Sequence, residues 1–186
     1  TDCDFITKAT AVYSNADGAI KAVNCSFTGG QVPFNINHKA NGTQTVAVEN
    51  CRFTNCGDAG GWKQFAAPLR LVNSGAGTLS AEVKGCAFAG TVGANGDILL
   101  GDGRKDQASN DVELKVVNTA ANIQAQKPGY YNKDGTVDET KKATATSLAS
   151  DTLETSVAKL LPVDPRTLGY ATSGKAEALP ATPDMN

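Results

Sequence analysis

Aromatic side chains and net charge are both scarce in this chain. Phe, Trp and Tyr make up 6% of its 186 residues, so a core has to be built mainly from small and β-branched side chains. The formal net charge of −2 offers no electrostatic basis for binding nucleic acid or an anionic membrane surface. No apolar run approaches the roughly 18 residues that a membrane-spanning helix requires, and no signal peptide is recognisable. We therefore expect neither a nucleic-acid partner nor membrane insertion.

The chain is also poor in the side chains that build metal centres and catalytic triads. His38 is the only histidine, and no Cys-x-x-Cys pair occurs, so the ligands of a zinc site are missing. No recognised motif places a Ser or Cys nucleophile beside His38, which argues against a catalytic triad. Phosphate loops, dinucleotide fingerprints and EF-hand loops do not occur either. From the residues alone we expect no metal and no cofactor.

What the sequence does contain is an internal repeat of a Cys-x-Phe step. Four segments align at this step, at residues 2–5, 24–27, 50–53 and 85–88, and a degenerate fifth copy lies at 118–121. An alternating strand is predicted before each later copy, at 19–23, 45–48, 79–83 and 112–116. A further strand is predicted within most coils, at 11–13, 32–36, 68–72 and 97–100.

Recurrence of one pattern in register favours stacked coils over an antiparallel sandwich. Equivalent residues of neighbouring parallel strands lie about 4.8 Å apart, so a residue type that repeats once per coil forms a column, whereas a sandwich gives no reason for the recurrence. Longer coils arise where insertions leave the turns. We predict an all-β parallel β-helix of about four to five coils over residues 1–126.

The clearest repeat positions are interpreted as packing residues. The inward column is expected to hold free thiols and aromatic rings, from Cys3, Cys25, Cys51, Cys86, Phe5, Phe27, Phe53 and Phe88. The asparagines that precede the cysteines, Asn24 and Asn50, are expected to stack at a turn and hydrogen-bond to each other and to the next coil. Cys56 falls outside the column and is expected to be free, with a bridge to Cys51 as the alternative.

The Asn-Cys-x-Phe step after an alternating strand resembles the pectin-lyase-like superfamily of right-handed parallel β-helices. The resemblance covers residues 1–126 and implies the right-handed fold. It leaves function open, because that superfamily includes polysaccharide lyases, glycoside hydrolases, adhesins, phage tail spikes and structural surface proteins. Its lyases hold calcium with carboxylates and use a Lys or Arg to take the proton beside a uronate, so calcium would enter here only if the chain is a lyase.

Two surface segments contain candidate functional residues. Asp97, Asp102, Arg104 and Lys105 are the catalytic candidates if the chain is an enzyme; glycosidase chemistry requires two carboxyl groups about 5 to 10 Å apart, which Asp97 and Asp102 can meet. The alternative is a solvated charged turn.

The second segment, the insertion at 54–66, holds the only tryptophan. Trp62, with Lys63 and Gln64 beside it, is a candidate sugar-stacking platform. In the alternative interpretation, Trp62 and Phe65 fold back over the flank of the β-helix.

The two ends differ from the repeat. Residue 1 falls inside a coil, so we expect either a longer protein or a partner that covers this end. Residues 127–164 are expected to form a cap region with a short amphipathic helix at 152–161, and residues 165–186 an extended tail or linker.

These features predict an extracellular or cell-surface β-helix module without catalysis. Its partner would be a polysaccharide or other glycan, or a protein, and it can form part of a larger assembly or a homo-oligomer. Two alternatives stay open. One is a polysaccharide lyase or glycoside hydrolase acting on an acidic polysaccharide, and the other is a phage or virion spike subunit.

Overall fold

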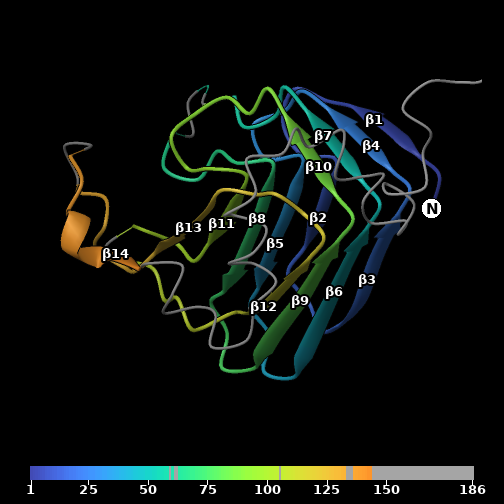
Figure 1. Ribbon diagram of the computed structural model, residues 1–186. Helices are drawn as coiled ribbons and strands as arrows, with labels where there is room; N and C mark the ends of the chain where they lie inside the picture. The colour runs from blue at the N-terminus through green and yellow to red at the C-terminus, as the bar shows by residue number, and fades with distance from the viewer. Residues whose placement is uncertain (59, 61–62, 105, 133–135, 144–186) are drawn as a thin grey trace, which may run out of the picture.

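The computed structural model describes residues 1–58, 60, 63–104, 106–132 and 136–143, and the regular secondary structure of these residues is almost wholly β-strand, arranged in three sheets (Figure 1). Sheet A contains β1 (Asp4–Ile6), β4 (Ser26–Thr28), β7 (Arg52–Thr54) and β10 (Ala87–Ala89). Sheet B contains β2 (Val12–Ser14), β5 (Phe34–His38), β8 (Leu69–Asn73), β11 (Ile98–Leu100), β13 (Ile123–Gln126) and β14 (Lys142–Ala143). Sheet C contains β3 (Gly18–Val23), β6 (Thr43–Glu49), β9 (Thr78–Lys84) and β12 (Glu113–Val117). A 3-10 helix, η1 (Glu139–Lys141), precedes β14.

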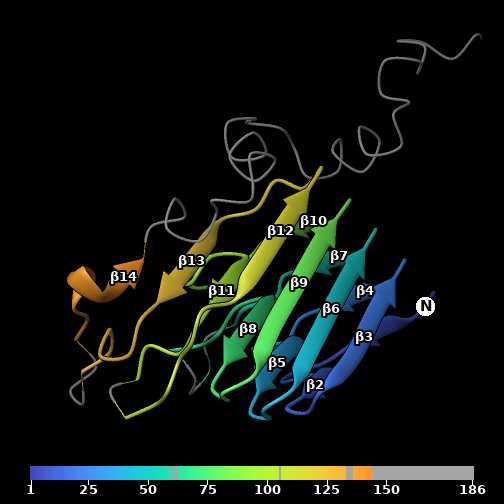
Figure 2. The same cartoon turned by 90° about the horizontal axis from the view of Figure 1, so that it is seen from below.

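The chain visits sheets A, B and C in turn and returns to each sheet one strand further along. Each returning strand pairs in parallel with its predecessor, and Figure 2 shows β3, β6, β9 and β12 side by side. Among the strands of the described residues, β14 alone pairs antiparallel, on β13. The prediction of an all-β chain with parallel strands is confirmed. The helix predicted at 152–161 and the tail at 165–186 lie outside the described residues.

The repeat fills the interior with columns of identical side chains. Four phenylalanine rings stack at centroid distances of 4.9, 4.8 and 4.9 Å, from Phe5 through Phe27 and Phe53 to Phe88. The thiols of Cys25, Cys51 and Cys86 are buried, whereas Cys3, which precedes the edge strand β1, is exposed. In sheet C the alternation puts Val46, Val48 and their equivalents inward, as a strand with one buried face requires.

Backbone conformation explains which residue types precede the repeat cysteines, and Thr119 in the fifth copy. Asp2, Asn24, Asn50 and Asn118 have φ between 46° and 54°, and Gly85 has φ 64°. Asn, Asp and Gly tolerate this left-handed region better than other residues, which explains why the repeat uses them. The expected stack of hydrogen-bonded asparagines is limited to one side-chain bond among the described residues, from Asn24 Nδ2 to Asp2 Oδ1 at 3.1 Å.

The fifth copy of the repeat departs from the others. Thr119 stands where cysteine is expected and accepts a hydrogen bond from the backbone N–H of Cys86 at 3.0 Å. Among the described residues, sheet A has no strand after β10, and the chain passes from this copy to β13 of sheet B. The Phe column therefore ends at Phe88.

Three irregular segments lie over the outer face of sheet B. They are the described residues of the insertion at 55–68, of the loop at 101–110 and of the segment at 127–132, which lie on the β11–β13 side of the sheet in Figure 1. Asn95 links the insertion to β13 and to the segment that follows it. Its Nδ2 donates to the carbonyls of Lys63 and Ala66, and its Oδ1 accepts from Gln126 and Tyr131. In the described part of the chain, no helix has the length and apolar character needed to cross a membrane.

Candidate functional site

A row of outward-facing residues crosses sheet B from strand to strand. In register, the row comprises Tyr13, Asn35, Arg70, Leu99 and Gln124. Tyr13 at the β2 end is exposed, and the other members are buried. Because these positions face away from the core, the irregular segments above the sheet are what bury them. The polar members of this row form the floor of the candidate site.

Asp102 binds two arginines above this floor. Its Oδ2 accepts hydrogen bonds from Arg70 Nη2 at 2.9 Å and from Arg104 Nη2 at 2.7 Å, and its Oδ1 accepts from Arg104 Nε at 3.0 Å. The Phe65 ring lies 5.0 Å from the guanidinium carbon of Arg70 and 5.3 Å from that of Arg104. We call Phe65, Arg70, Asp102 and Arg104 the arginine cluster. With two cations and one anion, it carries a net positive charge.

The members of the cluster differ in exposure. The Arg70 and Asp102 side chains are 4% and 3% exposed, whereas that of Arg104 is 44% exposed. Burial lowers the pKa of Arg70 to about 10, although the charge of Asp102 opposes this, so Arg70 stays charged at neutral pH. Burial also acts to raise the pKa of Asp102, but hydrogen bonds from Arg104 and the charge of Arg70 outweigh it, and this pKa lies below its ordinary value.

Arg70 leaves one donor without an acceptor. Its Nη1 donates to Asn35 Oδ1 at 3.1 Å and its Nη2 to Asp102, but its buried Nε finds no acceptor among the residues that the structure describes. A buried donor left unpaired is costly, so packing alone does not account for an arginine here. The charge of Asp102 and the stacking on Phe65 are the compensating interactions.

Asp97, the other candidate acid, takes no part in the arginine cluster. It directly precedes β11, whereas Asp102 follows the strand after Gly101, whose φ is 83°. Asp97 Oδ1 accepts from the Thr91 hydroxyl at 2.6 Å and its Oδ2 from the Asn122 backbone N–H at 2.7 Å. The structure thus brings Asp102 and Arg104 together but not Asp97. Lys105 lies outside the described residues.

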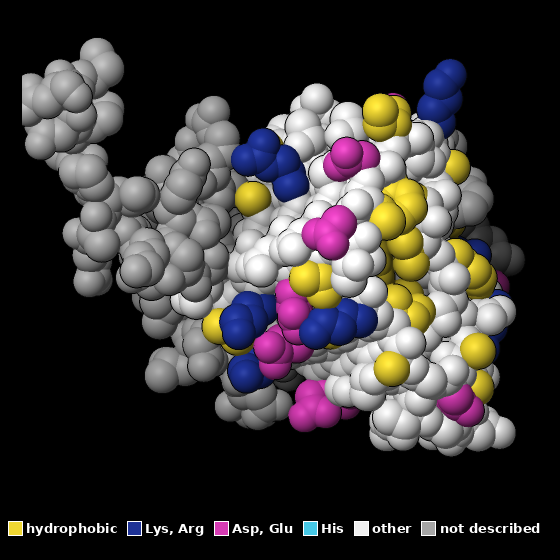
Figure 3. All heavy atoms as spheres, turned by 90° about the vertical axis from the view of Figure 1, so that its right-hand side faces the viewer, with side chains coloured by type: hydrophobic (Ala, Val, Ile, Leu, Met, Phe, Trp, Pro, Cys, Tyr) yellow, Lys and Arg dark blue, Asp and Glu magenta, His cyan; other side chains and the backbone are white. Residues whose placement is uncertain are grey.

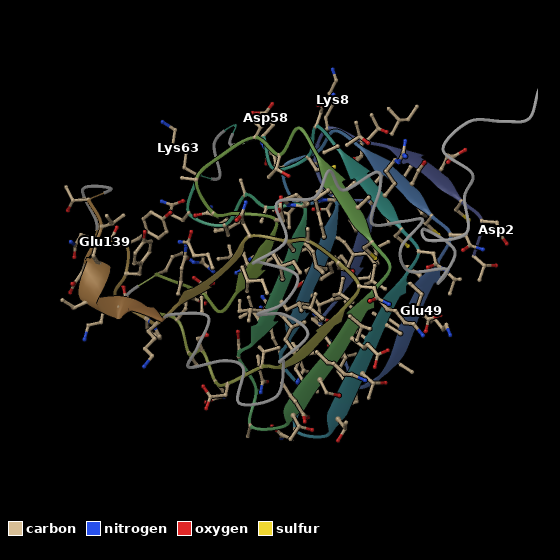
Figure 4. The ribbon with its side chains drawn as sticks, viewed as in Figure 1. Asp2, Lys8, Glu49, Asp58, Lys63 and Glu139 are labelled. Carbon is tan, nitrogen blue, oxygen red and sulfur yellow. The ribbon has the colours of Figure 1, made fainter. Side chains whose placement is uncertain are left out.

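The predicted glycan platform is only partly described. Trp62 lies outside the described residues, Lys63 is exposed and Gln64 is half-buried. Figure 4 shows the Lys63 side chain pointing away from the sheets into solvent. Phe65 contributes its ring to the arginine cluster, and the Lys63 carbonyl is tied to Asn95. The backbone of this insertion is therefore anchored beside the cluster.

The cysteines and the histidine do not form a second site. All five cysteines are free, and Cys56 is buried, where loss of solvation raises its pKa to about 11. His38 is buried at the end of β5, with Nε2 2.8 Å from Asp17 Oδ1 and Nδ1 3.1 Å from Asn73 Oδ1. Within the described ranges, no three His, Cys, Asp or Glu side chains are grouped so as to hold a metal ion.

Three members of the site were absent from the sequence-based candidates: Asn35, Phe65 and Arg70. Arg70 alternates with the inward-facing Leu69 and Leu71, so the strand pattern predicts a solvent-exposed arginine and gives no signal of its burial. Asn35 had a weak signal, as a polar residue inside an apolar strand. Comparison of the chain with family models, with curated proteins and with solved structures finds no match.

Proposed function

We propose that this chain is a non-catalytic module that binds an acidic glycan, displayed outside the cell or on its surface. We further infer that its strands follow a right-handed parallel β-helix. Support for the handedness is that crossover connections between parallel strands of one sheet are right-handed in about 98% of cases. The three parallel sheets visited in fixed order support the helical winding.

The proposal depends on how the Arg104 guanidinium is held and on the exposure of the Arg104 side chain. Asp102 engages its Nε and Nη2 from one side, and Phe65 lies against the group. The Nη1 protons have no acceptor among the described residues, and the side chain is 44% exposed. An arginine held in this way presents an oriented edge made of one Nη1 proton and the second Nη2 proton, which suits the bidentate binding of a carboxylate or sulfate.

The engagement of the acids favours binding over catalysis. Asp97 accepts from Thr91 and from a backbone N–H, and Asp102 accepts from two arginines. General acid–base catalysis needs a carboxyl group that can exchange a proton with the substrate, and both of these carboxylates are committed to internal donors. Lys63, two residues before Phe65 in the chain, is a further exposed cation, which supports an anionic ligand.

The proposal is tested by titrating the purified chain with acidic oligosaccharides, such as oligogalacturonate and a sulfated glycosaminoglycan, and with neutral xylo-oligosaccharides. Arg104→Ala should weaken acidic-ligand binding roughly 10- to 100-fold, the effect of losing a charge-assisted contact. Lys84→Ala removes an exposed cation from sheet C and should leave affinity unchanged. Equal affinities of wild type and Arg104→Ala, or no binding by wild type, would refute the proposal. Cleavage of the same ligands would favour the enzymatic alternative.

A further inference from the structure

Tyr13 is an exposed aromatic residue on the same face as the arginine cluster. It is 53% exposed in β2, where its neighbour Val12 packs against the core. Figure 3 views the molecule from the β1–β3 end and shows hydrophobic side chains at the surface there. The ring of Tyr13 makes no contact that the core requires, because it points to the outer face of sheet B.

The residue beside Tyr13 supplies a free and oriented donor. Asn35, directly opposite Tyr13 in the register, is 6% exposed, and its Oδ1 is held by Arg70 Nη1 at 3.1 Å. This bond fixes the orientation of the amide group. Asn35 Nδ2 has no acceptor among the described residues and is not a fully buried unpaired atom, so solvent reaches its protons.

These two residues continue the floor of the site past its covered part. Tyr13, Asn35 and Arg70 lie on successive strands about 4.8 Å apart, so Tyr13 stands about 10 Å from Arg70 along the row. The insertion with Phe65 covers the Arg70 end, while the Tyr13 end is open. The result is an exposed aromatic ring bordered by a nearly buried amide group, on the face where the partly exposed Arg104 side chain also lies.

We propose that Tyr13 and Asn35 form a sugar-ring subsite, with the ligand running along the row from Tyr13 toward Arg104. This inference rests on the proposed glycan-binding function. A sugar ring stacks on Tyr13, one of its hydroxyl oxygens accepts from Asn35 Nδ2, and a carboxylate or sulfate further along the same chain binds Arg104. An aromatic face with an adjacent directional amide suits a ring that is apolar on its faces and polar at its edge. The ligand class is thus an oligosaccharide that is anionic away from the stacked ring.

The experiment compares Tyr13→Ala and Tyr13→Phe in the full chain, by calorimetric titration with oligogalacturonate and a sulfated glycosaminoglycan oligosaccharide. Tyr13→Ala should weaken binding roughly 3- to 10-fold, the size of a stacking contact, and Tyr13→Phe should stay within about 2-fold of wild type because it keeps the ring. Ile6→Ala is the matched control, since Ile6 is 88% exposed on the outer face of sheet A, and its affinity should equal that of wild type. Equal urea midpoints for the variants would exclude an effect through folding.

The outcomes separate this inference from the function it depends on. If wild type binds and Arg104→Ala weakens binding but Tyr13→Ala does not, the subsite is refuted and the proposed function stands. Equal losses in Tyr13→Ala and Tyr13→Phe would also refute the subsite, because the ring is kept in the second variant. No binding by wild type refutes both. In a proton NMR spectrum of the wild-type chain, the Tyr13 ring signals are those absent from the spectrum of Tyr13→Phe. These signals should shift when the ligand is added.

Discussion

Replacing Asp102 by Asn tests whether the arginine cluster holds the protein together. The carboxylate accepts hydrogen bonds from two guanidinium groups, and the Arg70 side chain is only 4% exposed. The substitution keeps the shape of the side chain but leaves Arg70 buried without a counter-ion. Removing one partner of a buried ion pair costs about 3 to 5 kcal/mol. Urea unfolding at neutral pH, followed by circular dichroism, should show a loss of this size.

Asp97→Asn is the matched control for this loss. Asp97 is also buried, but its partners are the neutral Thr91 hydroxyl and the Asn122 backbone N–H. The expected loss is only about 1 to 2 kcal/mol. If Asp102→Asn proves no more destabilising than Asp97→Asn, the assignment of Asp102 as a buried counter-ion is wrong. If Asp102→Asn does not fold, Arg70→Met combined with Asp102→Leu should recover most of the stability, because an apolar replacement leaves no unpaired charge.

The pH dependence of the unfolding free energy tests the role of the Asp102 carboxylate independently. The pKa of Asp102 is lower in the folded chain than its ordinary value of 3.8. A carboxyl group with a depressed pKa stabilises the fold at pH values above its unfolded pKa and loses that contribution as pH falls through its folded pKa. The difference in unfolding free energy between wild type and Asp102→Asn should therefore be constant from pH 7 to about 5 and shrink in stronger acid. A difference that stays constant to pH 2 would contradict the lowered pKa.

Three further predictions concern the repeat. Phe53→Ala should lower the unfolding free energy measured in urea by about 3 to 5 kcal/mol, because the ring is 1% exposed and stacks on both sides. Phe5→Ala should lower it by about half as much, because Phe5 has one stacking partner and a half-buried ring. Equal losses would count against a stabilising role of the stack. A thiol reagent should titrate one cysteine per folded chain, the exposed Cys3, and all five after unfolding; a second fast thiol would contradict the described burial. Asn50→Ala should destabilise by roughly 1 to 2 kcal/mol because φ is 52°, while Asn50→Gly should lie within about 0.5 kcal/mol of wild type, and similar losses would exclude a conformational role.

The strands were predictable because their signal is local and repeated. Strand alternation over 79–83, for example, matches β9 within one residue at each end, and the recurrence of Cys-x-Phe predicted the stacking of equivalent strands that gives the Phe column. The asparagines were correctly placed at a turn, but their role was assigned to side-chain stacking. The backbone requirement for positive φ is the stronger cause, and a residue pattern does not show φ directly.

The candidate site was predictable only in part. Asp102 and Arg104 are close in sequence, so their contact follows from local geometry. Asp97 lies five residues before Asp102, but it hydrogen-bonds to the Thr91 hydroxyl and the Asn122 backbone N–H instead of to the arginines. Arg70 and Phe65 meet Asp102 and Arg104 because two insertions fold over one sheet face, and no local pattern encodes where a loop of irregular backbone will lie.

The sequence by itself determined that this chain stacks parallel strands, because a column of identical side chains arises only when equivalent residues lie in register. It also determined which residues line the interior, through the alternation of apolar and polar positions along each strand. The tertiary structure decided that irregular segments cover the outer face of sheet B and that Asp102 accepts hydrogen bonds from Arg70 and Arg104. It also decided that Tyr13 and Asn35 lie in the same row of outward-facing residues as Arg70. The contacts of Arg70 with Asn35 and Asp102 join residues more than thirty positions apart in the chain, so they depend on how the insertions pack, which only the folded chain specifies.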